Sequence, residues 1–160
     1  MISLRDVSPF TLRPLIGSGE KIALFTLPVL VTGIMLNVLF PAAFIVGGPP
    51  EALRLLSAVI LVPGLIVWAW SVALIVTRVP KHQLITSGPY SIVKHPLYTG
   101  VALLVVPWIG FLLDTWLGLV IGLVIYIGSR LYSPEEEAAL AHQFGSAWDD
   151  YCATVRIPWL

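Results

Sequence analysis

The sequence predicts an all-α protein: a polytopic membrane helical bundle of about four transmembrane helices, plus a cytoplasmic C-terminal amphipathic helix. Hydrophobic residues make up 58% of the 160 residues and charged residues 11%, whereas soluble domains have about 45–50% and about 25%. Several uncharged stretches approach the roughly 20 residues that a helix needs to cross a bilayer, and turn residues separate these stretches. We therefore expect residues 1–160 to form a single integral membrane domain.

Charge, cysteine and histidine patterns argue against several other classes of protein. Nine basic residues balance nine acidic ones, so no basic excess favours a nucleic-acid partner. The single cysteine, Cys152, cannot form an internal disulfide. The three histidines show no H-x-x-x-H spacing, so we expect no metal site.

Four apolar stretches are the predicted spans. Gly47 and Gly48, Arg78, and Asp114 mark the breaks between them. Prolines within the stretches predict kinks rather than helix ends, because neighbouring helices can satisfy the freed carbonyls; these are Pro28, Pro41, Pro63 and Pro107. The predicted spans are residues 22–46, 55–77, 96–113 and 115–129.

Small and polar residues within the spans have structural interpretations. Gly118 and Gly122 form a G-x-x-x-G pair, which is typical of closely packed membrane helices. Asn37 is the only amide inside a span, and we interpret it as an interhelical hydrogen-bonding residue.

The distribution of positive charge predicts the orientation. Arg78, Lys81 and Lys94 lie between the second and third spans, whereas only Arg54 lies on the other side. Because positive loops stay in the cytoplasm, we expect both termini and the loop 78–95 to be cytoplasmic.

Residues 81–100 form the first polar segment. Gly88 and Pro89 predict a turn, and Pro96 is placed to begin the third membrane helix. His95 and Tyr98 would then lie at the mouth of that helix, where open backbone N–H groups favour an anionic group such as a carboxylate. A juxtamembrane loop with anchoring Lys and Tyr side chains explains the same residues, so both interpretations stay open.

Residues 133–151 form the second polar segment. Ser133, Pro134 and Glu136 fit a capping box at a helix start, which would account for Glu136 without any ligand. An apolar stripe follows, and it predicts an amphipathic helix docked onto the first polar segment. The stripe consists of Leu140, Phe144, Trp148 and Tyr151.

These two segments carry a family resemblance. Residues 84–100 read L-I-T-S-G-P-Y-S-I-V-K-H-P-L-Y-T-G, which closely resembles the T-S-G-x-Y-x-x-x-R-H-P-x-Y-x-G run of the isoprenylcysteine carboxyl methyltransferase family. The second segment is similar to that family in its acidic pair and the residues after it. The matching positions are Glu136, Glu137, Leu140, Phe144, Gly145, Trp148 and Tyr151, with Arg156 and Pro158 in the tail.

The resemblance implies a methyltransferase that uses S-adenosyl-methionine, releases S-adenosyl-homocysteine and has no Rossmann domain. It implies a cofactor-binding, catalytic part at 81–160 and a two-helix N-terminal scaffold at 1–80. The cofactor-binding residues that it implies are His82, Gln83, Leu84, Ile85, Tyr90, His95, Pro96, Leu97, Tyr98 and Glu136.

The resemblance also implies a lipophilic or prenylated acceptor, above all the carboxylate of an isoprenylcysteine-like substrate. Lys94 replaces the family's usual Arg. Arg130 is a candidate catalytic clamp for the acceptor carboxylate, or else an anchor of the last span at the membrane surface. An amine or thiol acceptor would need a base, for which His95 and Glu137 are the catalytic candidates.

Other functions stay open at this point. A phospholipid or thiol methyltransferase of the same fold is one, and an NADPH-dependent membrane reductase resembling the steroid 5-alpha-reductase group is another. A non-catalytic membrane scaffold is a third. The short chain points to a prokaryotic inner (cytoplasmic) membrane, where a prenylated protein need not be the substrate.

Overall fold

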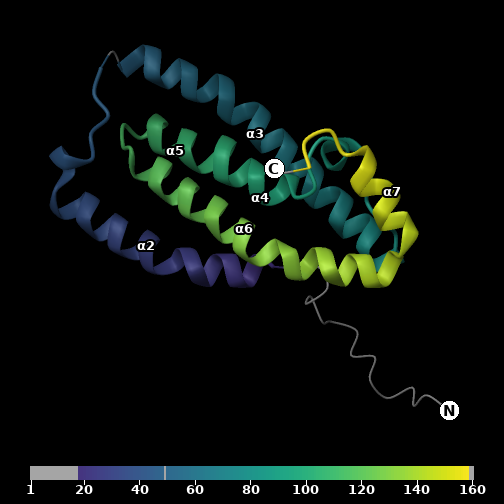
Figure 1. The fold of residues 1–160 in the computed structure, drawn as a ribbon. Coiled ribbons are helices and arrows are strands. Elements are labelled where there is room, and N and C mark those ends of the chain that lie inside the picture. Colours follow the sequence, from purple (N-terminus) through teal and green to yellow (C-terminus); the bar gives the residue numbers. More distant parts are fainter. Residues whose placement is uncertain (1–17, 49, 159–160) are drawn as a thin grey trace.

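The computed structural model describes residues 18–48 and 50–158, which fold as a bundle of helices (Figure 1). The apolar sequence gives long helices wherever no turn residue intervenes, because an isolated backbone in lipid must satisfy its own hydrogen bonds. In chain order the elements are α2 Gly19–Leu39, η1 Pro41–Ala43, α3 Pro50–Arg78, η2 Val79–Lys81, η3 Gly88–Ser91, α4 Pro96–Gly100, η4 Val101–Val105, α5 Val106–Leu112, α6 Leu117–Phe144 and α7 Ser146–Thr154.

Three of these helices, α2, α3 and α6, are long and apolar enough to cross a membrane. A shorter apolar helix, Pro96–Leu112, is built from α4, η4 and α5. The expected helical membrane bundle is thus confirmed, with one of its helices shorter than the other three. The turn from α5 to α6 passes through Asp114, whose φ of 55° agrees with the predicted break at this residue.

The helices lie side by side in the order α3, α4–α5, α6 and α2 (Figure 1). α3 packs against α4, η4 and α5, and α2 packs against α6 on the other side of the hairpin. α2 and α3 therefore flank the α5–α6 hairpin. The division into a scaffold at 1–80 and a catalytic part at 81–160 stays a prediction.

Small residues allow the helices of the hairpin to touch through their backbones. A Cβ added to Gly118 would lie 2.5 Å from the Val106 carbonyl oxygen, and one added to Gly122 would lie 2.4 Å from that of Ala102. Both contacts are far inside van der Waals distance, so the predicted close packing at the G-x-x-x-G pair is confirmed.

A second small-residue stripe, which the sequence analysis missed, lies on α3. Ser57, Gly64 and Ser71 are buried at seven-residue spacing, and a Cβ on Gly64 would lie 2.8 Å from that of Leu104. The two serine hydroxyls donate to carbonyls one turn earlier in their own helix. They therefore need no partner from another helix.

The chain after α2 departs from the sequence expectation. Pro41 was predicted as a kink, but α2 ends at Leu39 because the residue before a proline is pushed out of the helical region, as Phe40 is with φ −131° and ψ 58°. The connection then docks on the α5–α6 turn. There the Trp116 indole donates to the Ala43 carbonyl at 2.8 Å.

Asn37 lies at the same end of the bundle. Its side-chain oxygen accepts a 2.9 Å hydrogen bond from the Thr115 hydroxyl. This contact joins α2 to the turn before α6, so the predicted interhelical hydrogen bond of Asn37 is confirmed.

The predicted capping box at residues 133–136 is wrong. α6 continues through Pro134 to Phe144, and Ser133 is buried inside it rather than capping it. A proline inside a helix costs roughly 3 kcal/mol, and the glutamates that follow Pro134 contact α2 and the loop before α4. The break comes instead at Gly145, whose φ of 54° and ψ of −130° suit glycine.

Candidate functional site

The start of α2, the loop between α3 and α4, the last turns of α6, and α7 meet at one end of the bundle (Figure 1). Polar side chains from these elements contact one another there. The apolar part of α6 that was predicted to span the membrane ends at Ser129. The acidic residues 135–137 therefore lie beyond the membrane-spanning part of this helix.

Glu136 joins three elements of the fold. Its Oε2 accepts a 3.0 Å hydrogen bond from the Ser18 backbone N–H and a 3.3 Å hydrogen bond from the Tyr98 hydroxyl. The neighbouring Glu135 forms an exposed ion pair with Lys21 on the first turn of α2. Both glutamates thus hold the beginning of α2 against the end of α6, and a carboxylate beside a helix N-terminus is favourable.

Glu137 faces the loop that precedes α4. Its Oε2 accepts a hydrogen bond from Nζ of Lys94 at 2.5 Å, and its Oε1 lies 3.1 Å from Nε2 of His95. The hydrogen bond with His95, together with that from Lys94, lowers the pKa of Glu137 to about 2. Glu137 is therefore ionised at neutral pH and is better suited to holding Lys94 and His95 than to taking up a proton.

The first residues of α4 are rigidly held. Pro96 begins the helix as predicted and is fully buried. His95 before it is 9% exposed, and its ring stacks on Tyr98 with centroids 5.9 Å apart. The His95 and Tyr98 side chains thus lie together at the mouth of the third membrane helix.

The two polar segments dock onto each other, as the sequence predicts. The Tyr151 hydroxyl of α7 donates to the Tyr90 carbonyl at 2.9 Å, and the Ile157 N–H donates to the Ile92 carbonyl at 2.8 Å. Burial raises the pKa of both Tyr90 and Tyr151 well above the usual range. An apolar cluster beneath this contact contains Leu84, Leu140, Phe144, Trp148, Tyr151 and Val155.

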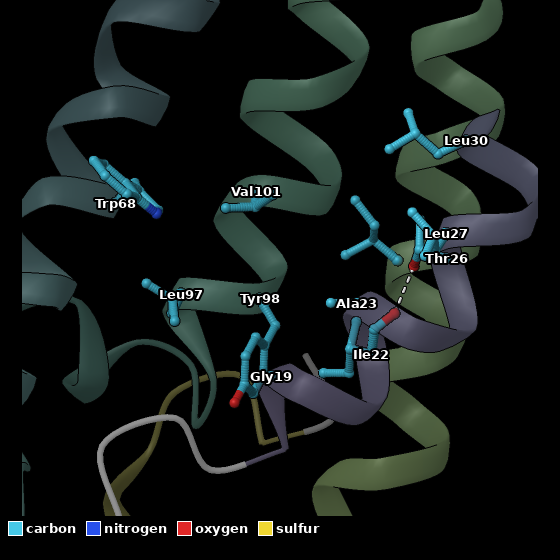
Figure 2. A pocket seen from close by; sticks show the side chains of 11 residues that line it. Gly19, Ile22, Ala23, Thr26, Leu27, Leu30, Trp68, Leu97, Tyr98 and Val101 are labelled. Carbon is cyan, nitrogen blue, oxygen red and sulfur yellow. Dashed lines mark hydrogen bonds between the residues drawn. The ribbon is translucent and has the colours of Figure 1, made fainter. Parts of the chain in front are cut away.

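An apolar groove of about 350 Å³ opens beside this polar site (Figure 2). One wall is a face of α2, the other includes Trp68 of α3, and Tyr98 lies at its polar end (Figure 2). Thr26 is the polar residue of the α2 wall, and its hydroxyl donates to the Ile22 carbonyl. The groove therefore offers a hydrocarbon surface that begins next to Glu136. Its lining residues are Gly19, Ile22, Ala23, Thr26, Leu27, Leu30, Trp68, Leu97, Tyr98, Val101 and Ile125.

Some of the sequence-predicted site residues lie together and others do not. His95, Tyr98, Glu136 and Glu137 form one cluster, and Tyr90 lies close enough for the charge of Glu136 to raise its pKa.

The remaining predicted cofactor residues take different places. Leu97 lines the groove, and Leu84 packs against α7. His82 and Gln83 are exposed in the loop, and Ile85 is half-buried.

Arg130, the candidate clamp, is exposed on the face of α6 that also carries Leu123 and Ile127, and it does not line the groove. Its catalytic role stays a prediction, as does that of Glu137.

The contribution of α2 is what sequence reasoning missed. The helix carries no recognisable motif, yet it supplies one wall of the groove and the Ser18 contact to Glu136. The available signal was the spacing of its small residues, Gly19, Ala23 and Thr26, on one helical face between large apolar ones.

Across residues 18–48 and 50–158, no group of three or more His, Cys, Asp and Glu side chains is arranged to hold a metal ion. The site offers carboxylates, an imidazole, an ammonium and phenols in pairs and hydrogen-bonded chains. Its chemistry is therefore that of a site for a polar, partly charged organic group.

The fold and site define a helical membrane protein with a polar site at one end of the bundle and a lateral apolar groove beside it. Residues 52–142, more than half of the chain, match the family model of the isoprenylcysteine carboxyl methyltransferase (ICMT) family, and the chain belongs to this family. It is therefore an integral membrane methyltransferase. Searches of the curated proteins and of the solved structures gave no match.

Proposed function

We propose that the protein transfers a methyl group from S-adenosyl-methionine to a lipophilic acceptor, the carboxylate of an isoprenylcysteine-like compound. The observation that carries this proposal is the double position of Tyr98, which lines the apolar groove and donates a hydrogen bond to Glu136. The proposed polar site for the methyl donor and the apolar groove for the acceptor thus meet at the Tyr98 side chain. This is the arrangement that a transfer from a water-soluble cofactor to a greasy acceptor requires.

The polar cluster fits the chemistry of this cofactor. Glu136 can accept hydrogen bonds from an ammonium or from ribose hydroxyls. Lys94 and His95 are donors for a carboxylate, and they lie next to the start of α4, whose open N–H groups favour an anion. The bound cofactor would supply an electrophilic methyl group on a sulfonium.

With a carboxylate acceptor, no residue of the chain needs to act as a general base. Such a group has a pKa near 4 and is ionised at neutral pH. Catalysis would rest on alignment and on exclusion of water by the loop, α6 and α7. The ion pair of Glu137 with Lys94 and its hydrogen bond with His95 support this, because a carboxylate held in this way positions its partners.

A second candidate acceptor is a lipid amine, and the charge at the groove supports it. Glu136 is next to the polar end of the groove, and none of its described lining residues is cationic. Arg130 lies on another face of α6. An ammonium headgroup would be attracted to Glu136, and His95 would be the candidate base.

Methyl transfer in lipid nanodiscs tests both candidates. The purified protein is given methyl-labelled S-adenosyl-methionine with either N-acetyl-S-farnesyl-cysteine or phosphatidylethanolamine. The proposal expects labelled methyl ester from the first acceptor, lost in Glu136→Gln and kept in the matched control Glu135→Gln. Labelled amine alone would establish the second candidate. Tight NADPH binding or no transfer to either acceptor would contradict the proposal.

We also propose that the polar end of the bundle faces the cytoplasm of a prokaryotic inner membrane, with both termini on that side. Arg78, Lys81 and Lys94 lie at this end in sequence and fold, and Arg54 lies at the opposite end. This asymmetry supports the orientation under the positive-inside rule. It also puts the polar site where a soluble cofactor is available.

A further inference from the structure

We propose that α2 sets the length of the acceptor's hydrocarbon tail, and that the groove takes a single tail of about 13 main-chain carbons whose far end stops at Leu30. This inference rests on the proposed function, because it assigns the tail of the same acceptor. The α2 wall of the groove lies outside the family match at 52–142, so the length limit that this wall sets is a property of this chain's own α2.

The direction of the tail follows from the chemistry along the groove. Tyr98 and Gly19 mark the end next to Glu136, and Leu30 marks the other end (Figure 2). Between them the α2 wall is hydrocarbon, since the Thr26 hydroxyl is already bonded within its helix. A polar headgroup therefore belongs at Tyr98 and the apolar tail along α2.

The length of the groove follows from the helix. Gly19 and Leu30 are eleven residues apart on α2, which corresponds to ~16 Å at 1.5 Å per residue. An extended chain advances about 1.25 Å per carbon, given a bond of about 1.5 Å and a near-tetrahedral angle. About 13 carbons therefore reach from Tyr98 to Leu30.

The far end of the groove lies against the protein core. Leu30 and Ile125 both pack against the buried cluster of Phe44, Leu117 and Ile121. A longer tail would have to turn out of the groove at this point. The volume of about 350 Å³ is at the low end for small-molecule sites, so the groove has room for one chain and not for two.

Selectivity for tail length must come from the fit of the tail in the groove, because the hydrophobic effect does not provide it. A tail in the bilayer is already surrounded by hydrocarbon, so moving it into the groove gains only packing contacts. Affinity should therefore pass through a maximum at the matching length. Simple partitioning into lipid would instead increase steadily with chain length.

The test measures binding without the cofactor. The full chain in nanodiscs is titrated with N-acetyl-S-alkylcysteines whose brominated alkyl chains are shorter than, equal to or longer than about 13 carbons. Bromine quenches nearby tryptophan, and the quenching lost in Trp68→Phe reports occupancy of the groove. The expected result is a maximum near the matched length.

Matched variants make the test specific. Ala23→Phe fills the groove and should weaken binding of the matched chain by about tenfold or more. Leu24→Phe on the next position, 61% exposed and outside the lining, should leave it unchanged. Leu30→Ala should move the maximum to longer chains.

Two results would overturn the inference: affinity rising steadily with chain length in all variants, or equal loss in Ala23→Phe and Leu24→Phe. Length-selective binding without methyl transfer would contradict the proposed function and keep the groove assignment. Methyl transfer that is insensitive to Ala23→Phe would contradict the groove assignment and keep the proposed function.

Discussion

The backbone N–H of Ser18 donates a 3.0 Å hydrogen bond to Oε2 of Glu136, 118 positions further along the chain. The same oxygen accepts from Tyr98 at the start of α4. Glu136 is thus a structural junction between α2, α4 and α6 as well as the proposed cofactor contact. Substitutions at this residue separate the two roles when stability and binding are measured together.

Glu136→Ala is expected to lower the free energy of unfolding by about 1–2 kcal/mol, because the hydrogen bonds from Ser18 and Tyr98 to a charged group are lost at a half-buried site. Thermal unfolding in detergent measures this effect. Glu135→Ala is the matched control and should change little, because its ion pair with Lys21 is exposed. Equal destabilisation by both variants would contradict the junction role of Glu136.

Stability should depend on the charge of Glu137. Its pKa is lowered from 4.5 to about 2, so the stabilisation is fully present above pH 4.5 and is lost as the pH falls toward 2. The difference in melting temperature between the native chain and Glu137→Gln should therefore be constant near neutral pH and shrink below about pH 4.5. A difference that does not change with pH would show that the ionised Glu137 and its contacts with Lys94 and His95 contribute nothing to stability.

The backbone contact at Gly122 predicts a severe effect of added volume. Gly122→Val would place a Cβ 2.4 Å from the Ala102 carbonyl oxygen, and the α5–α6 hairpin would have to separate at a cost of at least about 2 kcal/mol. Leu123→Val, on the exposed face next to it, should cost little. Yield of folded protein and melting temperature compare the two, and similar behaviour would argue against close hairpin packing.

Cys152 offers a direct test of the orientation. It is the only cysteine in the chain, and it lies partly exposed on α7. A membrane-impermeant maleimide should label it in inverted inner-membrane vesicles but not in intact spheroplasts.

The double variant Cys152→Ser/Glu51→Cys carries its thiol at the opposite end of the bundle and should show the reverse pattern. Labelling of Cys152 in spheroplasts would place the polar site outside the cytoplasm.

The sequence predicted the contact between the two polar segments, where side-chain type alone decides the contact. The sequence indicates a membrane helix that begins at His95–Pro96 and an apolar stripe at Trp148–Tyr151 that must be buried. α7 docks on the loop as expected. Ser133 and Pro134 led to the wrong prediction of a helix start, because a capping pattern depends only on neighbouring residues in the sequence. The contacts that Glu135–Glu137 make where α6 continues past Pro134 involve residues far away in the sequence.

The groove was not predictable from hydrophobicity, which left the spacing of the small residues on α2 as its signal. In a bilayer, the exposed and groove-lining faces of α2 are equally apolar, so Leu24 and Leu27 look alike in the sequence although only Leu27 lines the groove. Hydrophobic periodicity, which distinguishes the faces of a soluble helix, carries no such information here. The side to which α2 packs is decided by its contacts with α6 and by Ser18 and Glu136.

The central claim is that the loop before α4 and the end of α6 form one cofactor site, and titration calorimetry of the detergent-solubilised full chain with S-adenosyl-methionine tests it most directly. The native chain and Glu135→Gln should bind with the same affinity. Glu136→Gln and His95→Ala should each weaken binding by about tenfold or more in protein that is still folded at the temperature of the titration. Absence of binding to the folded native chain, or equal affinity in all four proteins, would contradict the account.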